Sequence, residues 1–148
     1  MIVVGIDPGK TGAVSVMKPT GLHTINKMPD TPKDIYLLFK AIKLAYRDEE
    51  IVAYLERIYG TAASGGNAMV NFGKNSGHIE MALIVLKIKY IEVRSQDWQK
   101  ELGCLTGSNK NISKRKAQAI FPGVHITHTT ADALLIGHYG QKKEKIIC

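Results

Sequence analysis

Three acidic residues stand at positions where their carboxylates could do chemistry together. Asp7 ends a β-branched segment that begins at Ile2, and Glu56 ends a second apolar segment that begins at Ile51. Asp132 lies far along the chain, near the start of a segment with helical periodicity. If the two strands are parallel neighbours, Asp7 and Glu56 meet at one edge of the sheet, because the carboxyl ends of parallel strands share an edge. Asp132 could join them from its helix.

The chemistry of such a set follows from its charge. Three converging carboxylates cannot all stay ionised without compensation, since like charges raise one another's pKa and burial adds a desolvation cost. A hard divalent cation such as Mg²⁺ resolves this, because it prefers oxygen ligands and keeps several waters. Two such ions about 4 Å apart can activate a water and neutralise the leaving oxygen of a phosphodiester. The three acids therefore indicate metal-dependent phosphodiester hydrolysis.

Each acid also has a simpler interpretation. Asp7 precedes a Pro-Gly pair and could serve only as a turn former. Glu56 stands beside Arg57 and could be a salt-bridged strand end. Asp132 follows two threonines closely and could be a first-turn acid that complements the helix dipole. The metal interpretation draws its force from the three residues taken jointly.

Residues 5–11 (GIDPGKT) hold Gly, Lys and Thr in a strand-to-turn context, which invites a nucleotide-binding interpretation. A Walker A loop needs four residues between its first and second Gly, whereas this segment has three, and Asp7 would set a negative charge beside the phosphates. The Asp-x-Gly-x-Thr part also resembles the phosphate loop of actin-like ATPases and sugar kinases. That architecture needs two domains around its nucleotide, and 148 residues are too few for it.

Composition favours one folded domain with an anionic partner. The chain is 45% hydrophobic, which suffices for a single core. Twenty Lys and Arg against thirteen Asp and Glu give a formal net charge of +7, which favours nucleic acid or acidic lipid without choosing between them. The longest apolar run stops at Lys87, far short of the roughly 20 residues that cross a bilayer, so no membrane segment is expected.

The expected compartment is the cytoplasm. The chain opens on a strand-like segment that contains Asp7, with no basic region followed by a long apolar stretch, so we expect no secretory signal. Cys104 and Cys148 are the only cysteines, and both are predicted to be free thiols in a reducing environment.

The elements that must position the acids follow from the hydrophobic periodicity. Strands are predicted at residues 2–7, 12–17, 22–27, 51–55 and 88–93. Helices are predicted from Pro32 to Ala45, at residues 68–86, from Ser95 onward, at residues 113–121, and at residues 130–139 with a stop at Gly140. Small-residue loops are expected at residues 60–66 and 103–111, and a basic tail at 141–148.

This order of elements predicts the fold class. Strands followed by strands that alternate with helices indicate an α/β domain with a mixed five-stranded sheet flanked by helices. An antiparallel meander would then join parallel strands through helical crossovers.

Three segments resemble the RuvC family of Holliday junction resolvases: residues 5–9 (GIDPG), 54–59 (YLERIY) and 131–136 (ADALLI). Residues 71–77 (NFGKNSG), 93–100 (VRSQDWQK) and 121–122 (FP) resemble blocks common in phage-encoded RuvC-like resolvases. Together these segments cover nearly the whole chain, and their order and spacing leave few competitors.

The resemblance implies an RNase H-like fold for residues 1–148 as one nuclease domain, acting as a homodimer. It implies an endodeoxyribonuclease that resolves four-way DNA junctions by paired nicks with Mg²⁺ or Mn²⁺, leaving 5′-phosphate ends. A phage source would place the protein in the host cytoplasm. The alternatives are a broader nuclease for flaps and forks, which the same site would support, and a junction-binding protein without catalysis.

The resemblance also implies roles for individual residues. It places metal ligands, and catalysis, at Asp7, Glu56 and Asp132. Cellular members carry an Asp or His three residues before the last Asp, where this chain has Thr129. His128 lies four residues before Asp132, so it could reach the site on a continuous helix, as a ligand or a proton-transfer group. His128 could equally form a hydrogen bond at the helix start.

The family tends to place an aromatic three residues after the second acid, where it inserts at the junction's crossover, and this chain has Tyr59 there. Stacking on a base is worth about 1–3 kcal/mol, although Tyr59 could equally pack under the loop that follows. The other large aromatics, Phe72, Trp98 and Phe121, are expected to be core or anchoring residues, because large aromatics usually bury.

Basic residues gather beside the loop at 103–111. We predict that this cluster binds phosphates, although a charge run is often only a solvated face. The cluster consists of Lys110, Lys114, Arg115 and Lys116, and Lys74 could extend it.

Overall fold

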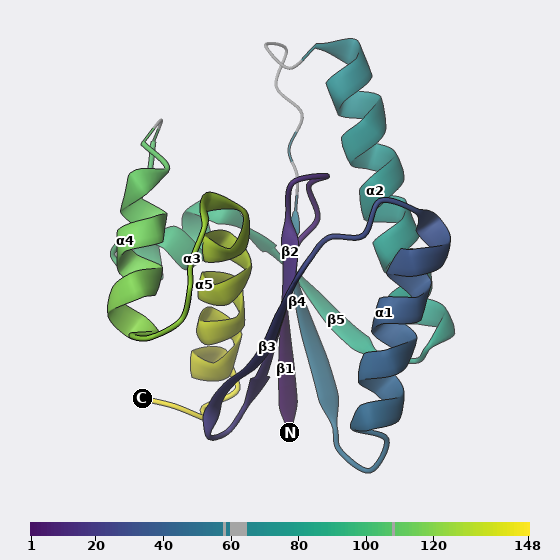
Figure 1. Cartoon of the computed structure of the whole chain (residues 1–148), viewed down its shortest axis with the longest axis horizontal. Coiled ribbons are helices and arrows are strands. Elements are labelled where there is room, and N and C mark those ends of the chain that lie inside the picture. Colours follow the sequence, from purple (N-terminus) through teal and green to yellow (C-terminus); the bar gives the residue numbers. More distant parts are fainter. Residues whose placement is uncertain (58, 60–64, 108) are drawn as a thin grey trace.

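The computed structural model of the chain describes residues 1–57, 59, 65–107 and 109–148 (Figure 1). Its strands form one sheet in the order β3-β2-β1-β4-β5. In chain order the strands are β1 (Ile2–Asp7), β2 (Ala13–Lys18), β3 (Gly21–Lys27), β4 (Ile51–Arg57) and β5 (Lys89–Arg94). The first three pair antiparallel as a meander, and β1, β4 and β5 pair parallel. The predicted mixed α/β sheet is therefore confirmed.

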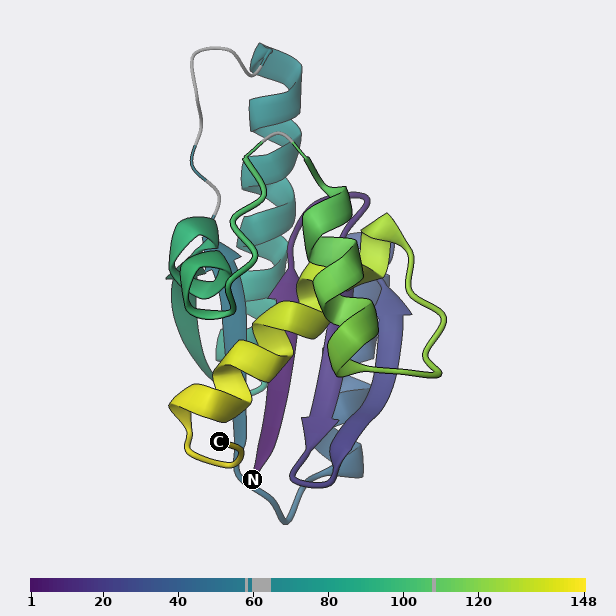
Figure 2. The same cartoon turned by 90° about the vertical axis from the view of Figure 1, so that its left-hand side faces the viewer.

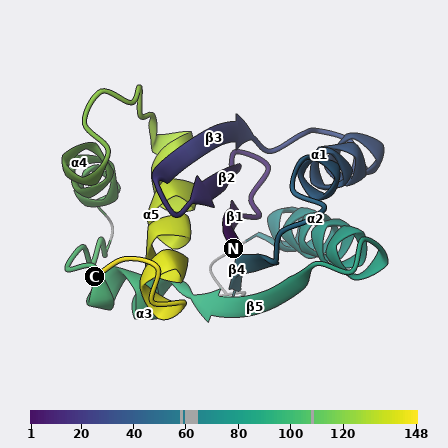
Figure 3. The ribbon, with the colours of Figure 1, turned by 90° about the horizontal axis from the view of Figure 1, so that it is seen from below.

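Helices cover both faces of this sheet, as the end-on view in Figure 3 shows. One face carries α1 (Pro32–Ala45) and α2 (Gly66–Val85). The other carries α3 (Ser95–Glu101), α4 (Asn111–Ile120) and α5 (His128–Lys143). None of these helices, within the residues the structure describes, is long and apolar enough to cross a membrane.

The central strands are apolar on both sides because both of their faces are covered. Along β1, Val4 and Ile6 join the core under α1 and α2, whereas Val3 joins the core under α5. The first five residues of both β1 and β4 are buried. The two strands that end in Asp7 and near Glu56 therefore form the middle of the molecule, which gives those acids a rigid base.

Helix α5 lies unusually close to β1 and β2, and Figure 2 shows it crossing them diagonally. A Cβ atom added to Gly5 would clash with backbone atoms of Gly137 and Ala133, so only glycine allows this approach. The buried hydroxyl of Ser15 donates a hydrogen bond of 2.7 Å to the carbonyl of Ala133. Because Gly5 is two residues before Asp7 and Ala133 follows Asp132, this contact brings the two acids toward each other.

Helix α5 is longer at both ends than its periodicity predicted. It begins at His128, where Thr127 caps it, and runs through Gly140 to Lys143. Gly140 does not stop the helix; a Cβ there would press on the side chains of Tyr54 and Val3, so its small size serves close packing.

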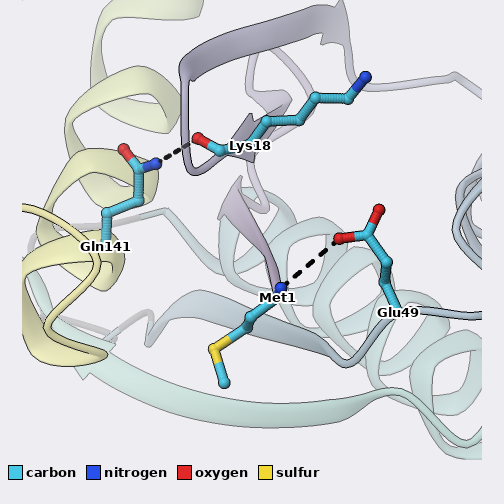
Figure 4. Close-up of polar contacts among 4 residues, drawn as sticks. All are labelled: Met1, Lys18, Glu49 and Gln141. Carbon is cyan, nitrogen blue, oxygen red and sulfur yellow. Dashed lines mark hydrogen bonds and ion pairs between the residues drawn. The ribbon is translucent and has the colours of Figure 1, made fainter.

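The segment expected as a basic tail therefore begins inside the helix. Gln141 is buried, and its side-chain amide donates a hydrogen bond of 2.7 Å to the Lys18 carbonyl (Figure 4). The amino terminus of Met1, just before β1, forms an ion pair of 3.5 Å with a Glu49 carboxylate oxygen. The same view shows this contact.

Other boundaries shift by a few residues. Strand β4 continues past Leu55 to Arg57, so Glu56 lies within the strand, and α2 begins at Gly66. Most of the loop expected at 60–66 lies outside the described residues, as does residue 108 of the loop at 103–111.

We predict that Gly5→Ala destabilises the fold by several kcal/mol, because a methyl group there meets backbone that cannot move aside. Gly73→Ala is the matched control: it lies exposed on α2 with open space around it, and should stabilise the helix by about 0.5–1 kcal/mol. Urea unfolding of both variants measures the difference. Equal stabilities would contradict the assigned contact between β1 and α5.

Candidate active site

The three acids selected from the sequence line one cleft of about 670 Å³ at the carboxyl ends of β1 and β4. Ile6 pairs with Leu55 in the parallel register, so Asp7 and Glu56 follow directly on neighbouring strands. Asp132 reaches the cleft from the second turn of α5. In Figure 1 this edge of the sheet is at the top, between α2 and α4.

The surroundings of Asp7 disfavour the ionised form of its carboxyl group. The pKa of Asp7 is raised to about 6, mainly by burial and to a smaller extent by the nearby Asp132 carboxylate. Against this, the backbone N–H of Gly9 donates a hydrogen bond of 3.3 Å to Asp7 Oδ1, and Lys110 attracts the charge. The Gly9 amide comes from the tight turn that follows β1, which explains the Pro-Gly pair after Asp7.

Glu56 is the most strongly perturbed of the three. The pKa of Glu56 is raised to about 8, mainly by burial and then by the charges of Asp7 and Asp132. The indole N–H of Trp98 donates a hydrogen bond of 3.1 Å to Glu56 Oε1, which favours the ionised form.

Asp132 follows the same pattern. Burial raises the pKa of Asp132, while a hydrogen bond from Ser113 and the charges of Lys110 and His128 lower it. Each acid thus receives one hydrogen bond from a separate element, and the acids repel one another.

The donor chemistry fits a hard divalent cation. Three carboxylates that line one cleft at an electrostatic cost offer the oxygen ligands that Mg²⁺ prefers, and a bound cation would lower that cost. In the part of the chain that the structure describes, no three His, Cys, Asp or Glu side chains are already arranged to hold an ion. The carboxylates would therefore have to draw together around it.

Cationic side chains share the cleft with the acids. Lys110, Arg57 and Arg94 line it, and Lys110 lowers the pKa of all three acids. Lys110 was predicted from the sequence only as a member of a basic cluster. Arg94 was missed, although it ends β5 at the same edge of the sheet, so the strand-end rule that selected Asp7 and Glu56 would have found it.

The structure separates Lys110 from the rest of the predicted basic cluster. Lys114 and Arg115 face a shallow depression on the outer side of α4, and Lys116 lies near the buried Cys104. Lys74 lines a further small pocket on α2, beside Lys10 and His78. None of these four predicted DNA-binding residues lies in the cleft lining.

Two aromatic side chains line the cleft. Tyr59 is 53% exposed, and the guanidinium of Arg57 lies 5.1 Å from its ring centroid. Phe72 is 37% exposed, so the expectation that it would be a core residue is wrong. It lies on the half of α2 that extends beyond the sheet, where helical periodicity alone does not show which face is covered (Figure 1).

The fourth ligand predicted from the sequence stays a prediction. His128 is the first residue of α5 and is exposed, and its charge acts on Asp132. Thr129 is half-buried. Neither residue is among those that line the cleft.

We predict that Asp7→Asn stabilises the protein in the absence of metal. The folded state holds the pKa of Asp7 near 6 and that of Glu56 near 8, above their values in an unfolded chain. The folded state therefore binds more protons between pH 4 and 8, and the free energy of unfolding falls as pH rises across that window. Because Asp7→Asn removes one of these charges, its melting temperature in EDTA at pH 8 should be higher than that of the wild type by about 3 °C or more.

Asp48→Asn, at an exposed turn, is the control and should change nothing beyond error. A melting temperature of Asp7→Asn below that of the wild type at pH 8 would show that the Asp7 carboxylate is not held at a cost.

The fold of this chain is similar to that of solved structures over nearly its whole length. No family model and no curated protein matches the sequence. Among solved structures, Thermus thermophilus RuvC has a similar structure, with 17% identity and a TM-score of 0.73. The structure of T. thermophilus RuvC in complex with a Holliday junction substrate is also similar, with 16% sequence identity and a TM-score of 0.70. Both comparisons cover 99% of this chain and 96% of the other. The chain therefore has the RNase H-like fold of RuvC along nearly its entire length.

Proposed function

We propose that this chain is an endodeoxyribonuclease that resolves four-way DNA junctions by paired, divalent-cation-dependent nicks. The observation that carries the proposal is the gathering of Asp7, Glu56 and Asp132 from three separate elements into one cleft that Lys110 also lines. The fold shared with a RuvC that was solved with a Holliday junction substrate supports the choice of DNA.

The residues divide the chemistry among them. Asp7, Glu56 and Asp132 would hold Mg²⁺, with Mn²⁺ as a substitute, and two bound ions would activate a water and neutralise the leaving oxygen. Lys110 would attract the scissile phosphate toward the three acids, and its charge partly offsets their mutual repulsion. Hydrolysis that frees the 3′ oxygen leaves a 5′-phosphate end.

The rim of the cleft fits an opened DNA strand. Arg57 and Arg94 supply charge for the phosphates that flank the scissile bond. Tyr59 and Phe72 offer exposed aromatic faces on which bases can stack once they leave the duplex at the crossover. His128 stands close enough to Asp132 to affect its charge, and it is the candidate for proton transfer.

Paired cleavage needs a second copy of the chain. A homodimer with two-fold symmetry would present one cleft to each of two like strands, and the four-way junction has nearly the same symmetry. The net charge of +7 per chain, with Lys74, Lys114, Arg115 and Lys116 outside the cleft, would hold the duplex arms.

The first prediction from this proposal is that the protein nicks a synthetic mobile four-way junction symmetrically, with Mg²⁺ and not with EDTA. Sequencing gels of each labelled strand map the nicks, and a phosphatase-sensitive label identifies the 5′-phosphate. A flap and a linear duplex of the same sequence are the matched substrates. Efficient cleavage of the flap with an intact junction would instead favour a general branched-DNA nuclease. Tight binding of the junction without any cleavage would leave a junction-binding protein.

The second prediction separates Lys110 from the outer lysines. Lys110→Ala should lower the single-turnover cleavage rate by about 100-fold, because it removes a charge aimed at the reacting phosphate. Lys114→Ala combined with Lys116→Ala should leave that rate within a few-fold and instead weaken binding, lowering the slope of log affinity against log salt by about two. A Lys110→Ala variant that only weakens binding, together with a Lys114→Ala/Lys116→Ala variant that only slows cleavage, would contradict this division of roles.

A further inference from the structure

Trp98 is the only tryptophan of the chain, and it lies under the candidate active site rather than in its lining. Its side chain is fully buried in the apolar layer beneath α5. An indole has one polar group, an N–H that can only donate a hydrogen bond, and a buried indole normally needs an acceptor. The identity of that acceptor shows whether the residue does more than fill space.

The acceptor is a carboxylate oxygen of the candidate site. Trp98 Nε1 donates a hydrogen bond of 3.1 Å to Glu56 Oε1. The bond restrains the carboxylate through Oε1 and does not involve Oε2. A buried aromatic ring without a polar group would need no acceptor, so the bond to Glu56 gives the indole N–H a specific partner in the candidate site.

The backbone around Trp98 holds the donor rigidly. Glu56 and Val93 are register partners on β4 and β5, and α3 follows β5 directly. Arg94 and Asp97 form two hydrogen bonds of 2.8 Å across the first turn of α3. The indole is therefore attached through a short, fixed path to the strand next to the one that carries Glu56.

We propose, resting on the nuclease function proposed above, that Trp98 is a positioning residue: its indole N–H orients the Glu56 carboxylate for binding a divalent cation. It touches neither DNA nor the reacting atoms. Removing only the N–H should therefore weaken cation binding and cleavage together, while the fold and junction binding stay intact. Loss of a hydrogen bond that orients a metal ligand typically costs about 10-fold to 100-fold in metal affinity or activity.

The test compares the wild type with Trp98→Phe and with a chain that carries benzothienylalanine at position 98. The second variant replaces the indole N–H by sulfur and keeps the two-ring shape, so it remains informative if Trp98→Phe folds poorly. Phe39→Leu is the matched control, because Phe39 is equally buried but packs on the opposite face of the sheet. It lowers stability without touching Glu56.

The primary readout is binding of Mn²⁺ to the protein without DNA, measured from the electron paramagnetic resonance signal of the free ion. We expect both Trp98 variants to bind Mn²⁺ about 10-fold more weakly or worse. The Mg²⁺ concentration for half-maximal single-turnover cleavage should rise in parallel, and Phe39→Leu should match the wild type in both. Unchanged Mn²⁺ affinity in both variants, with a wild type that binds and cleaves, would overturn the positioning role and leave the nuclease function standing.

The fluorescence of Trp98 supplies an independent spectroscopic signature. Because its N–H bonds a proposed ligand, saturating Mg²⁺ should change the emission of the wild type, and Glu56→Gln should abolish that change. If the tryptophan emission stays constant although electron paramagnetic resonance shows bound Mn²⁺, the positioning role of Trp98 is contradicted. A wild type that binds no Mn²⁺ at all would defeat the nuclease proposal itself.

Discussion

The central constraint in this structure is the repulsion among three carboxylates that the fold holds in one cleft. Burial is the largest cause of the raised pKa of all three acids, Asp7, Glu56 and Asp132. The Asp132 charge also raises the pKa of Asp7, and the charges of Asp7 and Asp132 raise that of Glu56. Structural acids on a protein surface avoid such an arrangement, since each could turn toward water. Under the nuclease proposal, this arrangement offers carboxylate oxygens to a divalent cation, which links the electrostatic cost to the proposed function.

The backbone that enforces the repulsion is the close packing of α5 on β1. Gly5 and Gly137 let the helix backbone approach the strand, and Ser15 bonds to the Ala133 carbonyl at the same point. Asp132 is next to that contact and Asp7 is two residues beyond it. Small changes in this contact would move one acid relative to the other, so the glycines and the serine serve the site although none of them holds a functional group in it.

The hydrogen bonds to the acids limit the cost without removing it. Gly9, Trp98 and Ser113 each support one carboxylate from a different element, and Lys110 supplies a shared positive charge. This division has a functional meaning under the nuclease proposal, because each donor restrains one of the three carboxylates that would hold the cation.

The sequence predicted the sheet and the meeting of the acids because both follow from local rules: β-branched runs form strands, and parallel strands end at a common edge. It could not show the distant contacts. Gly140 was interpreted as a helix stop because glycine often ends helices, whereas here it makes room for Tyr54. Phe72 was expected in the core because burial is usual for phenylalanine, and Lys110 could not be separated from Lys114 by composition. The bond between Trp98 and Glu56 joins two residues 42 positions apart, which no local pattern reveals.

The most direct test of the shared cation site is an anomalous-diffraction map from crystals of the wild-type protein soaked in Mn²⁺. We predict manganese peaks in the cleft, within coordination distance of Asp7 and at least one of Glu56 and Asp132. A map with manganese bound only elsewhere on the protein, and with the three carboxylates still apart, would contradict it.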